Sequence, residues 1–356
     1  MTFDEATQAV PQEVIDGVTF HRHAFNGKLE NIRYVNCEFI DTTWHGVDMR
    51  DVAFMNCNFQ QMHGDAMRMH RVIWQGCKLN NISWRQSQLH HVQFMDGEAH
   101  DWRHVDGQFK QVMFSEMTAV NLTFQACEMH NTSWVNGHYR DFHLVQSTCR
   151  DVAWMSLEAI NAHFLNCNMD RFVGAKVVAS NMRLQSCEGG QVRWIQSEFD
   201  NLLVEDCTWS QAAWSHSQWT NGSIARSSLV GAGFDHASWV NVHVAASDLS
   251  RAMFDHATLQ GCDLSGVQAP GISLRDARLH RTSLRDACLT SLDARGVALD
   301  HVDLTNADCE GGNLIGQPPE AWRVTQHKHA RFVDDRAIDD QAWWNKNKPG
   351  PRRVWV

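Results

Sequence analysis

The sequence contains few prolines and no long apolar run. Of its six prolines, only Pro270 lies between residues 29 and 314. Nothing else in that span removes a donor from a backbone hydrogen-bond ladder. No stretch approaches the roughly 20 apolar residues that a transmembrane helix needs, and the acidic start, MTFDE, lacks the layout of a secretory signal. These absences predict a cytoplasmic protein with no membrane partner.

The sequence also lacks the motifs of common catalytic sites. It contains no GxSxG elbow, no phosphate-binding glycine loop and no HExxH helix. It has eleven cysteines but no CxxC pair that would begin a metal site. We therefore expect no catalytic residues, no metal and no cofactor.

What the sequence does have is a period of five. A bulky residue recurs at every fifth position from Leu29 to Leu314, and most of the 58 positions hold Phe, Trp, Leu, Met or Tyr. A second apolar or small residue lies two positions before each of them. Helical and strand side-chain periods are 3.6 and 2, so this pattern indicates a repeat architecture whose units are buried by stacking. The weak positions include Gly64, Ala99, His104, Ala119, Gly174 and Gly189.

The repeat unit is a small residue, a polar one, a bulky apolar one and two polar ones. It is plainest at residues 246–250 (ASDLS) and 261–265 (GCDLS). The pattern resembles the pentapeptide-repeat family, often written A(D/N)LXX. The resemblance implies an all-β fold, a right-handed quadrilateral parallel β-helix with four pentapeptides in each coil. About 14 coils at about 4.8 Å each would make a rod about 70 Å long.

Residues 20 apart should then form vertical columns. One inward column is aromatic at eleven of twelve positions, with Gly174 as the exception, and a corner column is made of asparagine. Asparagine tolerates left-handed backbone geometry, and stacked amides can hydrogen-bond. The aromatic column is Tyr34, Phe54, Trp74, Phe94, Phe114, Trp134, Trp154, Gly174, Trp194, Trp214, Phe234 and Phe254, and the corner column is Asn161, Asn181, Asn201, Asn221 and Asn241.

The chain is expected to have three parts. Residues 1–28 form an N-terminal cap, in which Phe20 and Phe25 keep the spacing of five but lie one residue off the main register. Residues 29–316 form the β-helix. Residues 317–356 form a tail without repeats, because Pro318 and Pro319 interrupt the pattern. An open solenoid end is a bare strand edge, so both flanks are candidates for covering it.

Cysteine and histidine invite other interpretations. Ten of the eleven cysteines fall on inward positions, where a free thiol acts as a small buried hydrophobe. We expect reduced core thiols rather than disulfides. The column of His216, His236 and His256, flanked by Asp235 and Asp255, could hold a metal or respond to pH, but a row along one face is not a converging tetrahedron.

The outer surface decides the function. Residues 29–314 carry a net charge of −11 and residues 317–356 a net charge of +3. One outward column is a basic stripe, which is either a solvated face or a binding site for an acidic partner. The stripe consists of Arg50, His70, His90, Lys110, His130 and Arg150.

The tail offers the other candidate binding residues. Tryptophan and arginine are enriched at binding hot spots, and the tail either folds back on the rod or faces a partner. The candidates are Trp343, Trp344, Arg352, Arg353 and Trp355. The sequence does not indicate the oligomeric state.

The sequence predicts a non-enzymatic scaffold or adaptor that binds protein partners and not nucleic acid directly. The resemblance implies a bacterial protein and raises two settings: accessory protein of a type VI secretion module, or, alternatively, a DNA mimic that binds a gyrase-type topoisomerase. A duplex about 70 Å long carries about 40 charges, so a net charge of −11 imitates it poorly.

Overall fold

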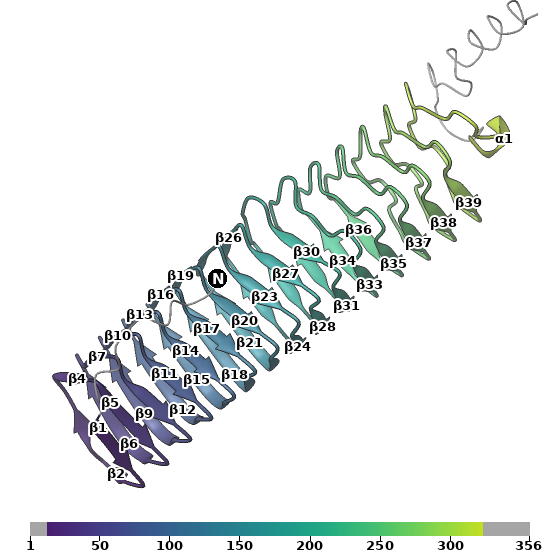
Figure 1. The fold of residues 1–356 in the computed structure, drawn as a ribbon. Coiled ribbons are helices and arrows are strands. Elements are labelled where there is room, and N and C mark those ends of the chain that lie inside the picture. Colours follow the sequence, from purple (N-terminus) through teal and green to yellow (C-terminus); the bar gives the residue numbers. More distant parts are fainter. Residues whose placement is uncertain (1–12, 323–356) are drawn as a thin grey trace, which may run out of the picture.

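The computed structural model describes residues 13–322. The strands follow one another around a long rod, and the sequence climbs steadily from one end to the other (Figure 1). The fold is a parallel β-solenoid of about 14 turns, as predicted. The one helix of the described residues, α1 (Pro319–Trp322), has four residues and is far too short to cross a membrane.

Two sheets run along the rod, each with one strand per turn. In both sheets all neighbours are parallel. The first sheet contains β1 (Glu13–Asp16), β5 (Ile32–Val35), β8 (Ala53–Met55), β11 (Ile73–Gln75), β14 (Gln93–Met95), β17 (Met113–Ser115), β20 (Ser133–Val135), β23 (Ala153–Met155), β27 (Val173–Ala175) and β30 (Arg193–Ile195). The second sheet contains β4 (Lys28–Glu30), β7 (Asp48–Arg50), β10 (Arg68–His70), β13 (Gln88–His90), β16 (Gln108–Lys110), β19 (Glu128–His130), β22 (Thr148–Arg150) and β26 (Asn168–Asp170).

The third sheet covers the two remaining faces, and six of its strands are eight residues long and bend around the corner between them. Its strands are β2 (Thr19–His21), β3 (Ala24–Phe25), β6 (Glu38–His45), β9 (Asn58–Asp65), β12 (Lys78–Arg85), β15 (Glu98–Val105), β18 (Thr118–Gln125), β21 (His138–Val145), β24 (Glu158–Ile160), β25 (His163–Leu165), β28 (Val178–Ser180), β29 (Arg183–Gln185), β31 (Glu198–Asp200), β32 (Leu203–Glu205), β33 (Gln218–Thr220), β34 (Ser223–Ala225), β35 (Ser238–Val240), β36 (His243–Ala245), β37 (Thr258–Gln260), β38 (Arg278–His280) and β39 (Ala298–Asp300).

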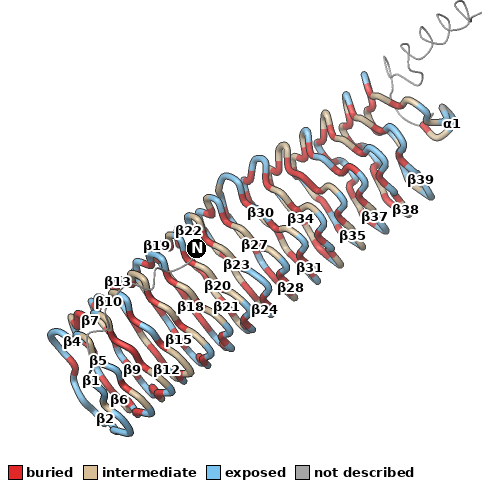
Figure 2. Tube along the Cα trace, in the orientation of Figure 1, coloured by how far each residue is buried: buried red, intermediate tan, exposed pale blue. Residues whose placement is uncertain are grey.

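The corners explain why the period is five. Every fifth residue from Asn31 to Gly316 has a positive φ, which turns the chain by one side of the square. Between the corners, the bulky residue and the small residue two positions before it point inward and are buried, as the regular alternation in Figure 2 shows. Strand partners are 20 residues apart, for example Met69 with Met49 and Leu89. Four pentapeptides therefore make one turn, as predicted.

The first turn is one residue shorter than the others. Positive φ angles occur at Gly17, Arg22 and Gly27, and the next is at Asn31, only four residues on. Phe20 accordingly pairs with Phe39, an offset of 19. Residues 13–28 thus form strands that continue the solenoid through the change of register. The division into a cap at 1–28, a β-helix at 29–316 and a tail at 317–356 remains a prediction.

The aromatic column lies inside the rod, behind the first sheet. Its rings are stacked from Tyr34 through Trp134 at centroid distances of 4.2–5.8 Å. At the one gap, Gly174, the ring of Trp194 occupies the space that a side chain would need. Trp154 and Trp194 meet across the gap at 6.4 Å, with their planes at 88°. The gap is therefore filled by the next coil rather than empty.

The corners tighten in the C-terminal half. Beginning with the Ser217 N–H and the Trp214 carbonyl, turns closed by a hydrogen bond across three residues become frequent. The donor residue is often alanine there, as at Ala232, Ala252 and Ala277, whereas the corresponding inward positions of the N-terminal half hold larger residues such as Val72 and Ile82. A small side chain at this position allows the corner to close more tightly.

The predicted asparagine column forms a ladder at one corner. All five residues have φ between 54° and 57°. The amide of Asn181 donates to Asn161 at 3.2 Å, and that of Asn201 donates to Asn181 at 2.8 Å. The column is not continuous, because Asn221 donates to Asp200 instead, at 3.2 Å. Asparagine thus serves both the turn geometry and the contact between coils.

Replacing Asn201 by alanine should lower the free energy of unfolding by about 1–2 kcal/mol. Alanine lacks the amide hydrogen bond, and its Cβ makes the left-handed conformation costly. Asn201→Gly removes the same hydrogen bond but tolerates the backbone, so it should cost less. Urea unfolding of both variants measures the difference. Equal losses would show that backbone geometry does not select asparagine here.

The cysteines and the first residues of the tail complete the core. Ten cysteines are buried, Cys288 is partly exposed, and all eleven are free thiols. Many thiols donate to carbonyls of the coil below, as Cys57 does to Tyr34 at 3.5 Å. At the C-terminal end Trp322 is only 1% exposed and joins the hydrophobic core.

Candidate protein-binding surface

The basic stripe predicted from the sequence lies on the outer side of the second sheet. The parallel register places each of its residues beside the next along β7, β10, β13, β16, β19 and β22. Glu30 precedes the stripe in this column and Asp170 follows it. Five steps of about 4.8 Å make the stripe about 24 Å long. The structure therefore brings all six residues together: Arg50, His70, His90, Lys110, His130 and Arg150.

At its N-terminal end, the stripe is neutralised by aspartates from neighbouring columns. Arg50 is paired with Asp48 at 3.3 Å. Arg71, at the adjoining corner, donates two hydrogen bonds to Asp51, both at 2.5 Å. The hydrogen bonds from Arg71 hold the pKa of Asp51 below its usual value. These arginines therefore have anionic partners in their own chain.

The C-terminal end is neutralised in the same way. His130 lies 3.8 Å from Asp151, and Arg150 lies 3.7 Å from Asp170. Asp151 also accepts a hydrogen bond from Arg171 at 2.5 Å, which lowers its pKa. Both ends of the stripe are consequently networks of mixed charge.

The middle of the stripe is different, because no acidic partner is recorded for its residues in the described range 13–322. The rings of His70 and His90 are 5.0 Å apart, and His91, at the neighbouring corner, lies 4.3 Å from His90. Burial and then the charge of Arg71 lower the pKa of His70, and burial and then His90 lower that of His91. Lys110 adds a permanent charge on the next coil.

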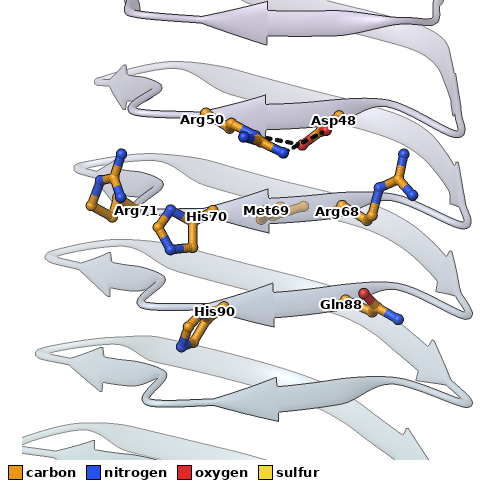
Figure 3. Close-up of a pocket in the computed structure, with 8 residues that line it drawn as sticks. All are labelled: Asp48, Arg50, Arg68, Met69, His70, Arg71, Gln88 and His90. Atoms are coloured by element: carbon orange, nitrogen blue, oxygen red, sulfur yellow. Dashed lines mark hydrogen bonds and ion pairs between the residues drawn. The ribbon is translucent and has the colours of Figure 1, made fainter.

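A shallow depression of about 350 Å³ opens beside these histidines. Figure 3 shows Arg68 and Gln88 on one side of it and His70 and His90 on the other, with the Arg50–Asp48 pair above. The rod was expected to be smooth, but side chains of unequal length on adjacent coils leave this hollow. Its cationic and amide donors suit a carboxylate or another small anionic group.

Two other histidine groups lie outside the stripe. The rings of His216, His236 and His256 form a parallel row at 4.7 and 4.9 Å. Asp255, which flanks this row, pairs instead with Arg275. The row does not converge on one point, as the sequence indicated.

His280, Asp300 and His301 do converge, with ligand atoms within 4.8 Å of one another. Nδ1 of each histidine lies 2.6 Å from a carboxylate oxygen of Asp300, and these contacts lower the pKa of Asp300. Two imidazoles and a carboxylate are ligand types that zinc accepts. Sequence reasoning missed this group, although the spacing of 20 between His280 and Asp300 was a usable signal.

The five tail candidates, Trp343, Trp344, Arg352, Arg353 and Trp355, lie outside the described residues. Of the tail's tryptophans only Trp322 is described, and it packs on the end of the rod. The stripe is therefore the candidate surface whose geometry can be analysed.

The repeats match known protein families. The family described as "Pentapeptide repeat region" matches residues 27–104, and "Pentapeptide repeats (8 copies)" matches residues 227–266 and 259–291. The period of five continues unbroken between these segments. The chain is a pentapeptide repeat protein. No curated protein sequence matches it.

Several solved structures are similar to the chain at low identity. HetL, a pentapeptide repeat protein involved in heterocyst differentiation regulation in Nostoc sp. strain PCC 7120, is 15% identical over 65% of this chain and 88% of its own, with a TM-score of 0.19. Full-length QnrB1, a plasmid-mediated fluoroquinolone resistance protein, is 14% identical over 78% and 92%, with a TM-score of 0.15. The mannuronan C-5 epimerase AlgE4 A-module of Azotobacter vinelandii is 10% identical over 78% and 90%, with a TM-score of 0.25.

Proposed function

We propose that this protein is a non-enzymatic scaffold that binds an acidic surface of a protein partner through the centre of the basic stripe. The observation that supports the proposal best is the contrast along the stripe. Its ends are neutralised by Asp48, Asp51, Asp151 and Asp170, whereas no acidic partner is recorded, among residues 13–322, for the cations at its centre. A carboxylate from a partner would supply the missing countercharge.

The shape of the molecule supports binding rather than catalysis. The described hollow beside the stripe is shallow and open, whereas catalysis needs converging groups from which water can be excluded. A rigid rod with a regular spacing of charges instead suits recognition of an extended protein surface. The cytoplasm is the proposed location, and the tail residues, including Trp343 and Arg352, are a second proposed contact region.

We further propose that the bacterial setting is a type VI secretion module, in which the rod would act as an accessory to spike, adaptor or effector components. This proposal rests on the length of the array, its weak acidity and its tail. Affinity capture from a lysate, followed by mass spectrometry, tests it. If spike, adaptor and effector components were all missing from the captured proteins, the setting would be wrong while the stripe could still be tested on other partners.

The alternative is a DNA mimic that inhibits a gyrase-type topoisomerase. The described surface carries arginine–aspartate pairs across neighbouring coils, such as Arg71–Asp51 and Arg171–Asp151, so many acidic groups are neutralised within the chain. That pattern differs from the unbroken anionic rows of duplex DNA. A gyrase supercoiling assay discriminates, because a scaffold of this kind should leave supercoiling unchanged at micromolar concentration.

Reversing one charge at the centre of the stripe should weaken partner binding. Lys110→Glu is expected to reduce the affinity for a captured partner at least fivefold, because it places a carboxylate opposite an acidic surface. Binding should also weaken between 50 and 300 mM salt. Lys176→Glu, at an exposed corner away from the stripe, is the matched control. Equal affinities of the two variants would exclude the stripe as the binding surface.

A further inference from the structure

The outer face of the first sheet is apolar over most of its length. Its strands direct two residues per coil outward, and none of the 15 outward residues from Val35 to Ala175 is charged. Eleven of them are apolar. They are Val35, Ala53, Met55, Ile73, Met95, Met113, Val135, Ala153, Met155, Val173 and Ala175, and the other four are Gln75, Gln93, Ser115 and Ser133. We call these 15 residues the apolar face.

The apolar face is open to solvent in the isolated chain. Ile73 is 37% exposed and Met155 is 45% exposed, and most of the other residues are half-buried between their neighbours along the sheet. By contrast, the outer sides of the second and third sheets carry charges on most coils. Contiguous apolar surface of this size, bordered by polar corners, marks an interaction site, and methionine packs well against varied surfaces.

We infer that the occupant of the apolar face is a second copy of this chain, packed face to face with the two rods antiparallel. The twofold axis runs parallel to the strands through β17, so each coil opposes the coil equally far on the other side of that strand. A surface without charge can meet itself with no like-charge repulsion, which is what a twofold interface requires. The basic stripe lies on a different sheet and remains accessible.

The area of the face suits a stable dimer. Eight coils at about 4.8 Å give a length of about 40 Å, and five residues between corners at about 3.3 Å give a width of about 16 Å. Each copy would therefore contribute about 600 Å², or about 1,200 Å² for both, at the lower end of standard stable interfaces. Two sheets packed this way lie about 10 Å apart.

The polar edge of the face is complementary in the antiparallel arrangement. The corner beside the stripe carries Asp51, Arg71, Asp151 and Arg171, paired within the chain as Arg71–Asp51 and Arg171–Asp151. Rotation about the axis at β17 places Asp51 opposite Arg171 of the second copy and Arg71 opposite Asp151 of the second copy. Each pair of the first copy thus meets a pair of reversed order, and four charges alternate at each end of the interface.

Two like-charge meetings accompany this register. Arg33 would lie opposite Arg193 of the second copy, beyond the ends of the apolar face, and Glu116 would lie near its own copy at the other corner. All three residues are exposed, so solvent screens these repulsions. They are smaller than the effect of burying eleven apolar residues from each copy.

The oligomeric state of the full-length chain tests the inference. Sedimentation equilibrium at low micromolar concentration should give the mass of a dimer. Met113→Glu, which places two carboxylates beside the twofold axis, should raise the dimer dissociation constant at least 100-fold with an unchanged circular dichroism spectrum. Val120→Glu, an outward residue of β18 on the third sheet, is the matched control and should leave the dimer intact. A wild-type monomer at 100 μM, or a dimer unaffected by Met113→Glu, would overturn the inference.

Cysteine cross-linking tests the register. Met113→Cys should form an interchain disulfide under oxidising conditions, because position 113 lies near its own copy, whereas Val173→Cys should not. Efficient cross-linking at both positions would indicate parallel rods and overturn the antiparallel arrangement. A photoreactive label on Met113→Cys that captures residues 323–356 of the same chain in a monomer would identify that segment as the occupant and likewise overturn the dimer.

Discussion

Replacing His104 by leucine is expected to stabilise the protein by about 1–3 kcal/mol at pH 7. His104 belongs to β15, is fully buried, and neither of its ring nitrogens has a hydrogen-bond partner among residues 13–322. It is surrounded by Trp84, Phe109 and Phe124, at ring distances of 4.8–6.4 Å. A buried polar group without a partner costs about 1–3 kcal/mol, and leucine removes that cost.

Acid should enlarge the difference between the two proteins. Burial lowers the pKa of His104 to about 3 in the folded state, compared with 6.5 for the exposed ring. The unfolded chain therefore binds a proton that the folded chain excludes, so the contribution of the neutral ring to stability is complete above pH 6.5. It is lost as the pH falls from 6.5 towards 3, at about 1.4 kcal/mol per pH unit. Between pH 7 and pH 4, the wild type should lose about 3 kcal/mol more than His104→Leu.

Urea unfolding at pH 7, 5.5 and 4 measures both effects. Protonation of the paired aspartates also destabilises the fold in acid, but it affects wild type and variant equally and disappears from the difference between them. His100→Leu is the matched control, since His100 lies on the same strand and is exposed. Equal pH dependence of wild type and His104→Leu would mean that the ring finds a proton acceptor or water.

Filling the gap in the aromatic column should destabilise the protein strongly. The sequence makes Gly174→Phe look like a restoration of the pattern, since phenylalanine occupies the same column at Phe94 and Phe114. In the structure, however, even a Cβ at residue 174 would overlap the six-membered ring of Trp194. Overpacking a filled core costs about 1–3 kcal/mol and sometimes more. We expect a loss above about 3 kcal/mol in the free energy of unfolding.

A compensating substitution distinguishes overpacking from other causes. Gly174→Phe combined with Trp194→Ala moves the large side chain by one coil and should recover much of the lost stability. Gly190→Ala is the control for adding a methyl group, because its Cβ would meet only ordinary contact, with Asp170 at 3.5 Å. Urea unfolding followed by tryptophan fluorescence measures all three. Full stability of Gly174→Phe alone would contradict the packing described for Trp194.

The inward half of the molecule was predictable because stacking repeats the same environment every 20 residues. One spacing placed the aromatic column, the buried cysteines and the asparagine corner. The basic stripe could also be predicted as a column. The aspartates that neutralise its ends could not, because Asp48 and Asp51 belong to neighbouring columns, and the direction in which their side chains turn is not encoded in the spacing.

Other features depended on departures from the repeat. The tight turns after Trp214 arise from local backbone hydrogen bonds, which a side-chain period does not report. His280, Asp300 and His301 converge because a strand residue and a corner residue of one coil meet the coil below. The apolar face was available in the sequence, since Met55, Met95 and Met155 recur at spacings of 20, but outward positions were analysed only for charge.

The buried thiols make the opening of individual coils chemically measurable. Burial raises the pKa of Cys127 to about 12 and that of Cys262 to about 11, and a thiol reagent needs the exposed thiolate. Buried cysteines are distributed from Cys37 to Cys309, so the order in which an alkylating agent modifies them would record where along the rod local unfolding begins. The molecule thus contains a set of position-specific reporters of fraying that requires no engineered label.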